Sequence, residues 1–253
     1  MVEALFWPAL IGYGEAAVAY ATVRTSRAAT WGVRLGWLAQ TALLIVQAAR
    51  ADGFPWSSWA GSLNLFVWFV VGAYLIWGCR PRFRLLGLSV MPLAVTLFIV
   101  ARVGGGTQAG AHSDYGNVFL VLHVGLVLAA FAGFTLAAGL AGLYLWVERR
   151  LKRRAADILR RRVPPLASLE RLTRRTILVS LPLLTVGLAI GVVRQQRDGG
   201  SFDALEAVTL LTWLVYGGFL ALRPTGRRAA YFALGGFALV IVARLALAGS
   251  HFT

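Results

Sequence analysis

The sequence has very few residues that carry thiol, acid or imidazole chemistry. Of 253 residues, one is cysteine, three are histidine and ten are Asp or Glu. Because Cys79 has no second cysteine in the chain, it can form neither an intramolecular disulfide nor a CxxC pair, which argues against thiol redox chemistry. The three histidines form no HxxxH or HExxH pattern, so the usual signature of a helical zinc site is missing.

Apolar residues are abundant instead, at 58% of the chain, with a mean hydropathy of +0.71. This composition excludes an ordinary soluble domain and predicts an all-α, polytopic transmembrane helix bundle that forms one transmembrane domain, 1–253. The first apolar run contains Trp7, Pro8 and Glu15 and has no basic segment before it, so we expect a permanent helix and no cleaved signal peptide. We expect Glu15 to be protonated or paired inside the bundle. Runs of about 20 residues predict eight spans, at roughly 4–23, 30–49, 60–79, 85–101, 117–146, 175–193, 205–222 and 229–249.

The net charge of +15 is distributed as a membrane topology signal. Most of the 25 Lys and Arg residues fall in alternate connections between the expected spans, and the connection 149–175 is the most basic. The positive-inside rule places these connections in the cytoplasm and both chain termini outside, in a bacterial cytoplasmic membrane. The charge therefore predicts contact with membrane lipid, and we expect no nucleic-acid partner.

The three histidines all fall on the predicted outer side. His123 lies six residues into the fifth expected span, about 9 Å along a helix, and His251 ends the eighth span. His112 lies in the outer connection "GGGTQAGAHSDYGN". An imidazole inside hydrocarbon is costly unless it is paired or ligating. The shared depth favours a ligand pair formed by His123 and His251, and a structural hydrogen bond is the alternative.

Residues near these histidines fit a flat metal cofactor with carboxylate arms. Arg244 precedes His251 by seven residues, so the two share one helix face. Imidazole nitrogens with an arginine for the propionates describe a haem site; Arg244 has Glu206, Asp203 or the outer surface as alternatives. The outer segment "GFPWSSWAGSL" contains Trp56 and Trp59. These side chains either pack against the face of the ligand or belong to an interfacial aromatic belt.

Five segments in order along the chain resemble CcsA-type cytochrome c assembly proteins, including the HemX-like members linked to haem biosynthesis. "PWSSWAGSL" is similar to an outer family pattern, and the "LHV" at His123 matches the start of a family span. "VPPLASLERL" resembles a cytoplasmic segment of the family, and "GRRAAYFALGGFALVIVARLALAGSHF" resembles its end. "FDALEAVTLLTWLVY" resembles the tryptophan-rich signature, with matches at Asp203, Glu206, Thr212, Trp213 and Tyr216.

The resemblance implies that His123 and His251 are the two external haem-ligating histidines, holding a b-type haem. It adds Phe202 and Asp203 to the expected haem-contacting residues, although Phe202 and Val208 replace signature tryptophans. The chain also has Gly61 and Arg244 where the family often has Glu and Asn. Ala221 stands where synthetase members carry a histidine within the membrane. The signature is thus weakened in the manner of the HemX-like relatives.

Three functions follow as hypotheses. The first is a haem-binding protein of cytochrome c maturation or of haem-biosynthesis regulation, which the weakened signature favours. The second is a cytochrome c synthetase subunit that works with a ResB-like partner. The third is a non-haem transporter or scaffold with structural histidines. The basic connection 149–175 is the expected surface for lipid or for a cytoplasmic haem-biosynthesis enzyme.

Overall fold

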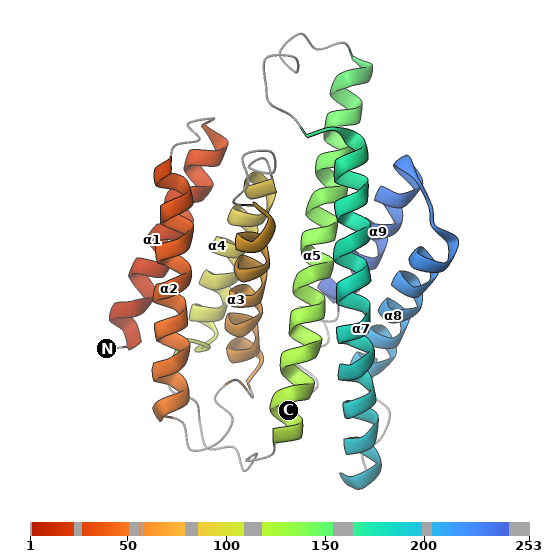
Figure 1. Ribbon diagram of the computed structural model, residues 1–253. Helices are drawn as coiled ribbons and strands as arrows, with labels where there is room; N and C mark the ends of the chain where they lie inside the picture. The colour runs from red at the N-terminus through yellow and green to blue at the C-terminus, as the bar shows by residue number, and fades with distance from the viewer. Residues whose placement is uncertain are drawn as a thin grey trace. The chain divides into compact units, whose positions relative to one another are not determined.

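The computed structural model describes residues 2–22, 27–50, 56, 58–78, 86–108, 118–153, 164–198 and 204–242. Nearly all of these residues lie in helices (Figure 1). The helices are α1 (Val2–Ala21), α2 (Arg27–Arg50), α3 (Trp59–Gly78), α4 (Gly87–Val103), α5 (Val118–Lys152), α7 (Leu166–Asp198), α8 (Ala204–Leu222) and α9 (Gly226–Ile241).

Each expected span overlaps one of these helices, which confirms the all-α prediction for the described residues; the end of the eighth expected span, 243–249, lies outside them. Four of them, α3, α5, α7 and α8, are long and apolar enough to cross a bilayer, and α4 is a shorter apolar helix. Within the described residues, the structure thus supports a polytopic helical membrane protein. The count of eight spans and the outer placement of the termini stay predictions.

The start of α7 differs most from the sequence expectation. The span was expected over 175–193, but the helix begins at Leu166, directly after Pro164 and Pro165. Leu169, Leu172 and Thr173 are buried in this added segment, whereas Arg171 is exposed. An amphipathic pattern therefore extends the helix beyond its apolar run into the basic connection.

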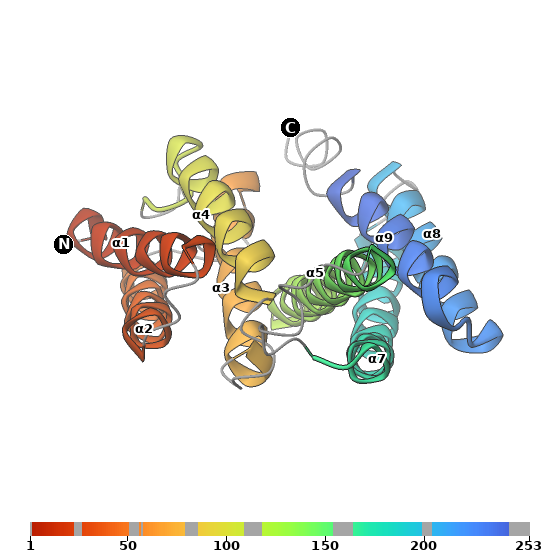
Figure 2. The ribbon, with the colours of Figure 1, turned by 90° about the horizontal axis from the view of Figure 1, so that it is seen from above.

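The helices form two compact units that divide inside α5: the first holds α1 to α4, and the second holds α5 from Leu122 onward with α7, α8 and α9. In the first unit, α2 packs on α1 and α3, and α4 packs on α3 and α1, so the four helices close a ring (Figure 2). Glycines allow α1 and α2 to approach closely: a Cβ added at Gly12 would lie 2.5 Å from the Gly32 carbonyl oxygen. Glu15 is exposed on α1 and has no partner among the described residues, so its expected pairing inside the bundle is not found there.

A chain of buried polar side chains runs through the first unit. The Tyr13 hydroxyl donates to Gln40 Oε1 at 2.6 Å. Gln40 Nε2 donates to Asn64 Oδ1 at 2.9 Å, and Asn64 Nδ2 donates to Gln47 Oε1 at 3.2 Å. Gln47 Nε2 in turn donates to the carbonyl oxygens of Gly106 and Gln108. All four side chains are fully buried. Their hydrogen bonds connect α1, α2 and α3 to the turn after α4.

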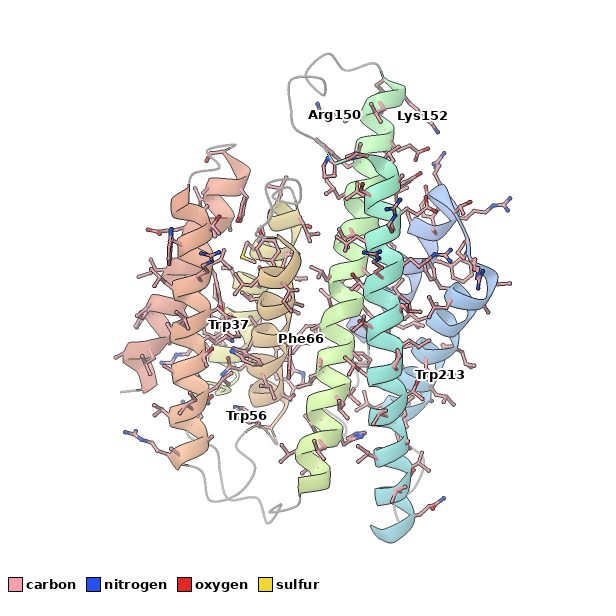
Figure 3. All side chains as sticks on the ribbon, viewed as in Figure 1. Trp37, Trp56, Phe66, Arg150, Lys152 and Trp213 are labelled. Carbon is pink, nitrogen blue, oxygen red and sulfur yellow. The ribbon has the colours of Figure 1, made fainter. Side chains whose placement is uncertain are left out.

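Aromatic contacts reinforce the same unit. Trp37 of α2 and Trp68 of α3 stack with their ring centroids 5.1 Å apart. The Trp37 indole N–H donates to the Trp68 carbonyl, and the Trp68 indole N–H donates to Thr41 Oγ1. Figure 3 shows Trp37 on α2 facing α3.

In the second unit, α8 packs on α7 and α9. The Tyr216 ring of α8 stacks on Phe134 of α5 at 3.8 Å, and its hydroxyl donates to the Ala233 carbonyl of α9. Trp213, labelled in Figure 3, donates its indole N–H to Thr185 Oγ1 of α7 at 2.8 Å. Where α5 ends, Glu148 pairs with Lys152 at 2.8 Å and with Arg227 at 3.6 Å.

Candidate functional site

His123 lies near the first turns of α5 and faces α7. Its ring is half-buried, and Nδ1 lies 2.7 Å from the carbonyl oxygen of Gly187. His123 is about 8 Å from the start of α5, and Gly187 is about 16 Å from the end of α7, by the rise of an α-helix. The contact thus joins the beginning of α5 to the C-terminal half of α7.

This hydrogen bond determines which ring nitrogen carries the proton. A carbonyl oxygen only accepts, so a neutral His123 ring must donate from Nδ1. The lone pair is then on Nε2, on the far side of the ring from Gly187. A backbone carbonyl on one ring nitrogen is the arrangement that fixes the orientation and tautomer of metal-ligating histidines. The same contact is the structural hydrogen bond expected as the alternative, and its tautomer also fits a histidine that would hold haem iron.

The other expected site residues are only partly within the described residues. Trp56 precedes α3 and Trp59 is its first residue; both are half-buried in the first unit. A Cβ added at Gly104 would lie 3.1 Å from the Trp59 ring, so this indole packs against the turn after α4. His123 belongs to the second unit. The expected site residues outside the described ranges are His112, Phe202, Asp203, Arg244 and His251.

The zinc alternative gains no support from the described helices. Within the described ranges, no group of three or more His, Cys, Asp or Glu side chains is placed to hold a metal ion.

Glu206, one alternative partner for Arg244, accepts a hydrogen bond from Gln195 Nε2 at 3.1 Å. This contact connects the start of α8 to the end of α7.

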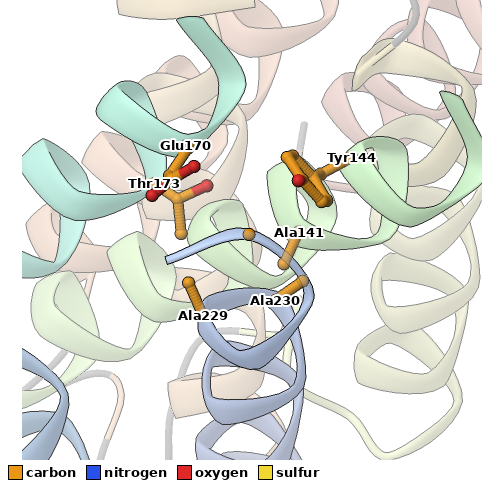
Figure 4. Close-up of a pocket in the computed structure, with 7 residues that line it drawn as sticks. Ala141, Tyr144, Glu170, Thr173, Ala229 and Ala230 are labelled. Carbon is orange, nitrogen blue, oxygen red and sulfur yellow. The ribbon is translucent and has the colours of Figure 1, made fainter. Parts of the chain in front are cut away.

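A small pocket lies elsewhere in the second unit. Figure 4 shows Tyr144 of α5 with Glu170 and Thr173 of α7 around it, and Ala229 and Ala230 of α9 below. Tyr144 is about 32 Å from His123 along α5, by helix rise. The pocket is therefore separate from the histidine.

Sequence reasoning missed two features of these units. The first is the glycine pair Gly187 and Gly191 beside His123, although the G-x-x-x-G spacing in "GLAIG" is a readable sign of close helix packing. The second is the buried network of Gln40, Gln47 and Asn64, for which three amides inside apolar runs were the available signal.

Comparison with known proteins identifies the family. The family model described as Cytochrome C assembly protein matches residues 56–249. The chain belongs to this family. The matched range contains His123 and Arg244 and ends two residues before His251.

Relatives within this family carry two kinds of name. "Cytochrome c biogenesis protein CcsA" of Microcystis aeruginosa (strain NIES-843 / IAM M-2473) is 26% identical over 269 residues, covering 85% of this chain and 82% of the relative. The CcsA protein of Guillardia theta is 27% identical over 263 residues, covering 93% of this chain and 81% of the relative. "Protein HemX" of Brevibacillus brevis is 26% identical over 180 residues, covering 71% and 66%. The resemblance expected from the sequence is confirmed.

Proposed function

We propose that this protein binds haem in the membrane and acts in cytochrome c maturation or in the regulation of haem biosynthesis. The observation that carries the proposal is the hydrogen bond from His123 Nδ1 to the Gly187 carbonyl, in a chain of the cytochrome c assembly family. The bond holds the ring in the tautomer that a histidine ligating through Nε2 needs, and the same bond is the structural alternative considered for this residue.

In this proposal, His123 and His251 would hold the iron of a b-type haem near the outer membrane surface. Arg244 steadies a propionate, and Trp56, Trp59, Phe202 and Asp203 contact or surround the haem. Bound haem supplies an iron centre that two neutral imidazoles hold in the low-spin state. The chain's own contribution is to fix the orientation of the imidazoles and to neutralise the propionate charge.

The proposal includes a location in a bacterial cytoplasmic membrane, with eight spans and both termini outside. Its support is the clustering of Lys and Arg in alternate connections, together with a helix over each expected span. The outer ends of α5 and α7 then carry His123 and Gly187 at the same side as His251.

A synthetase subunit that works with a ResB-like partner is the second candidate. The CcsA names of the relatives favour it, because those proteins are named for cytochrome c biogenesis. In this chain, however, Ala221 stands where synthetase members carry a histidine, so a partner would have to supply the missing haem ligand.

The test is an absorption spectrum of the detergent-purified protein with pyridine haemochrome analysis. We expect a low-spin b-type spectrum in the parent protein. His123→Ala or His251→Ala should abolish or convert it, Arg244→Ala should weaken haem retention, and His112→Ala should leave it unchanged. A parent without haem in haem-replete cells, or unchanged spectra in both ligand variants, would establish the non-haem scaffold instead. Cytochrome c formation that depends on a co-expressed ResB-like protein would favour the synthetase.

A further inference from the structure

The ring of His123 lies directly over a glycine of α7. A Cβ added at Gly191 would lie 2.7 Å from His123 Cε1 and 3.0 Å from Nδ1, and the three nearest atoms all belong to this imidazole. Real Cβ atoms essentially never approach other atoms within 3.0 Å, so with any larger residue here the ring or α7 must shift. The absence of a side chain at position 191 leaves the space that the ring occupies.

Gly187, one turn earlier on the same face of α7, has a different role. A Cβ added there would lie 2.9 Å from Val127 Cγ2 and 3.4 Å from the Val127 nitrogen. Gly187 therefore lets α5 approach α7 closely, which brings its carbonyl oxygen to 2.7 Å from His123 Nδ1. One glycine sets the helix spacing that makes the hydrogen bond, and the other makes room for the ring.

Other glycines in the same unit provide the comparison. An added Cβ would meet nothing within 4 Å at Gly125, Gly142, Gly217 or Gly218. At Gly133 it would clash with Ser180 Oγ, a packing contact between α5 and α7 that lies away from the histidine. Among the described glycines, only Gly191 has the His123 ring among its nearest atoms.

We propose that Gly187 and Gly191 are positioning residues that hold His123 as a ligand in the Nδ1–H tautomer. The inference rests on the proposed function for the identity of the ligand, haem, but the placement of the ring is a property of the polypeptide alone. Alanine at 191 pushes the imidazole away from α7 and breaks the bond to the Gly187 carbonyl. The ring then loses its fixed tautomer and its orientation toward the iron.

The first experiment reads the tautomer without haem. In a variant that carries His112→Ala and His251→Ala, His123 is the one remaining histidine, so ¹⁵N-histidine labelling gives a single pair of ring nitrogen signals. We expect a protonated Nδ1 and an unprotonated Nε2 at a pH where the ring is neutral. Adding Gly191→Ala should mix in the Nε2–H tautomer, whereas adding Gly142→Ala should not. An unchanged tautomer in the Gly191→Ala protein would overturn the inference.

The second experiment measures haem retention in the otherwise unaltered protein. Gly191→Ala should weaken haem binding roughly 10- to 100-fold, as expected when the group that orients a metal ligand is lost. Gly142→Ala and Gly217→Ala should bind haem as the parent does. Gly187→Ala combined with Val127→Ala removes the crowding while keeping the carbonyl, so it should retain more haem than Gly187→Ala alone. Haem binding by Gly191→Ala equal to that of the parent would contradict the proposal.

A folding control separates the ring clash from general misfolding. Because the atoms nearest to the added Cβ all belong to His123, Gly191→Ala should destabilise the parent but not the His123→Ala variant. If the single variant does not fold, His123→Ala should rescue its expression; failure to rescue would show that position 191 acts through something else. One further outcome separates the two proposals. If the parent binds no haem but shows the Nδ1–H tautomer, and Gly191→Ala loses that tautomer, the proposed function is wrong and the positioning role of Gly191 stands.

Discussion

His123 is anchored by a backbone carbonyl, which no side-chain substitution at position 187 can remove. The hydrogen bond must therefore be tested by substituting His123. Asparagine is the informative replacement, because its Nδ2 is attached to Cγ as Nδ1 is in histidine and can donate to the same oxygen.

We expect His123→Asn to lose haem while keeping most of the folding stability. Alanine at the same position should lose haem and also lose the hydrogen bond, which contributes about 0.5–1.5 kcal/mol. Haem spectra and thermal unfolding in one detergent measure both effects. Equal stability of the two variants would show that the bond to Gly187 contributes nothing measurable.

At the scale of single residues, the sequence identified His123 as a candidate but could not identify its hydrogen-bond partner. His123 was identifiable because an imidazole in an apolar run needs a partner. Gly187 is 64 residues away, and a backbone carbonyl carries no residue-specific signal, so the pairing needed the structure. The placement of His251 and Arg244 beside the haem stays a prediction.

At the scale of the helices, the buried amide network is the feature that a single substitution should destabilise most. Gln40→Leu removes the acceptor of the Tyr13 hydroxyl and a donor to Asn64, all fully buried. We expect it to destabilise the protein by about 1–3 kcal/mol, because these polar groups lose a partner where water does not reach. Thr96→Val on the exposed face of α4 should change stability by less than about 0.5 kcal/mol. Thermal unfolding that is equal for the two variants would refute a structural role of the network.

The basic connection belongs to the same scale. Helix α5 carries the chain about 44 Å from His123 to Lys152, by helix rise, so the point where the chain enters the basic connection is remote from the candidate ligand. We expect replacement of Arg160, Arg161 and Arg162 together by glutamine to leave the haem spectrum unchanged and to alter partner association or membrane yield. Loss of the chromophore from a correctly folded protein would contradict this separation.

The elements were well predicted where apolar runs define them. Long hydrophobic stretches bounded by basic clusters gave the approximate positions of the helices, because a bilayer span has a minimum length. The start of α7 was missed because "LASLERLTRRT" alternates apolar and charged residues, and hydropathy averaged over such a segment hides an amphipathic helix.

For the whole molecule, the sequence predicts a single transmembrane domain, and the structure resolves two compact helical units. The expected haem contacts come from both, with Trp56 and Trp59 in the first and His123 in the second. The gathering of these residues into one haem site stays a prediction.

The orientation in the membrane is testable by cysteine labelling. With Cys79 replaced by Ser, single cysteines at Ser113 and Thr253 should react with an impermeant thiol reagent from outside intact cells. A cysteine at Arg160 should react only after the membrane is opened. The reason is the concentration of Lys and Arg on the Arg160 side. An inside location for Thr253 would place the chain terminus on the cytoplasmic side and contradict an external haem site that includes His251.

Bis-histidine ligation of a haem is the central claim, and electron paramagnetic resonance of the purified ferric protein tests it most directly. Two neutral imidazoles on the iron predict a low-spin ferric signal that His123→Asn and His251→Ala each abolish or convert to high spin. A high-spin signal in the parent protein, or a low-spin signal that survives both substitutions, would contradict the account.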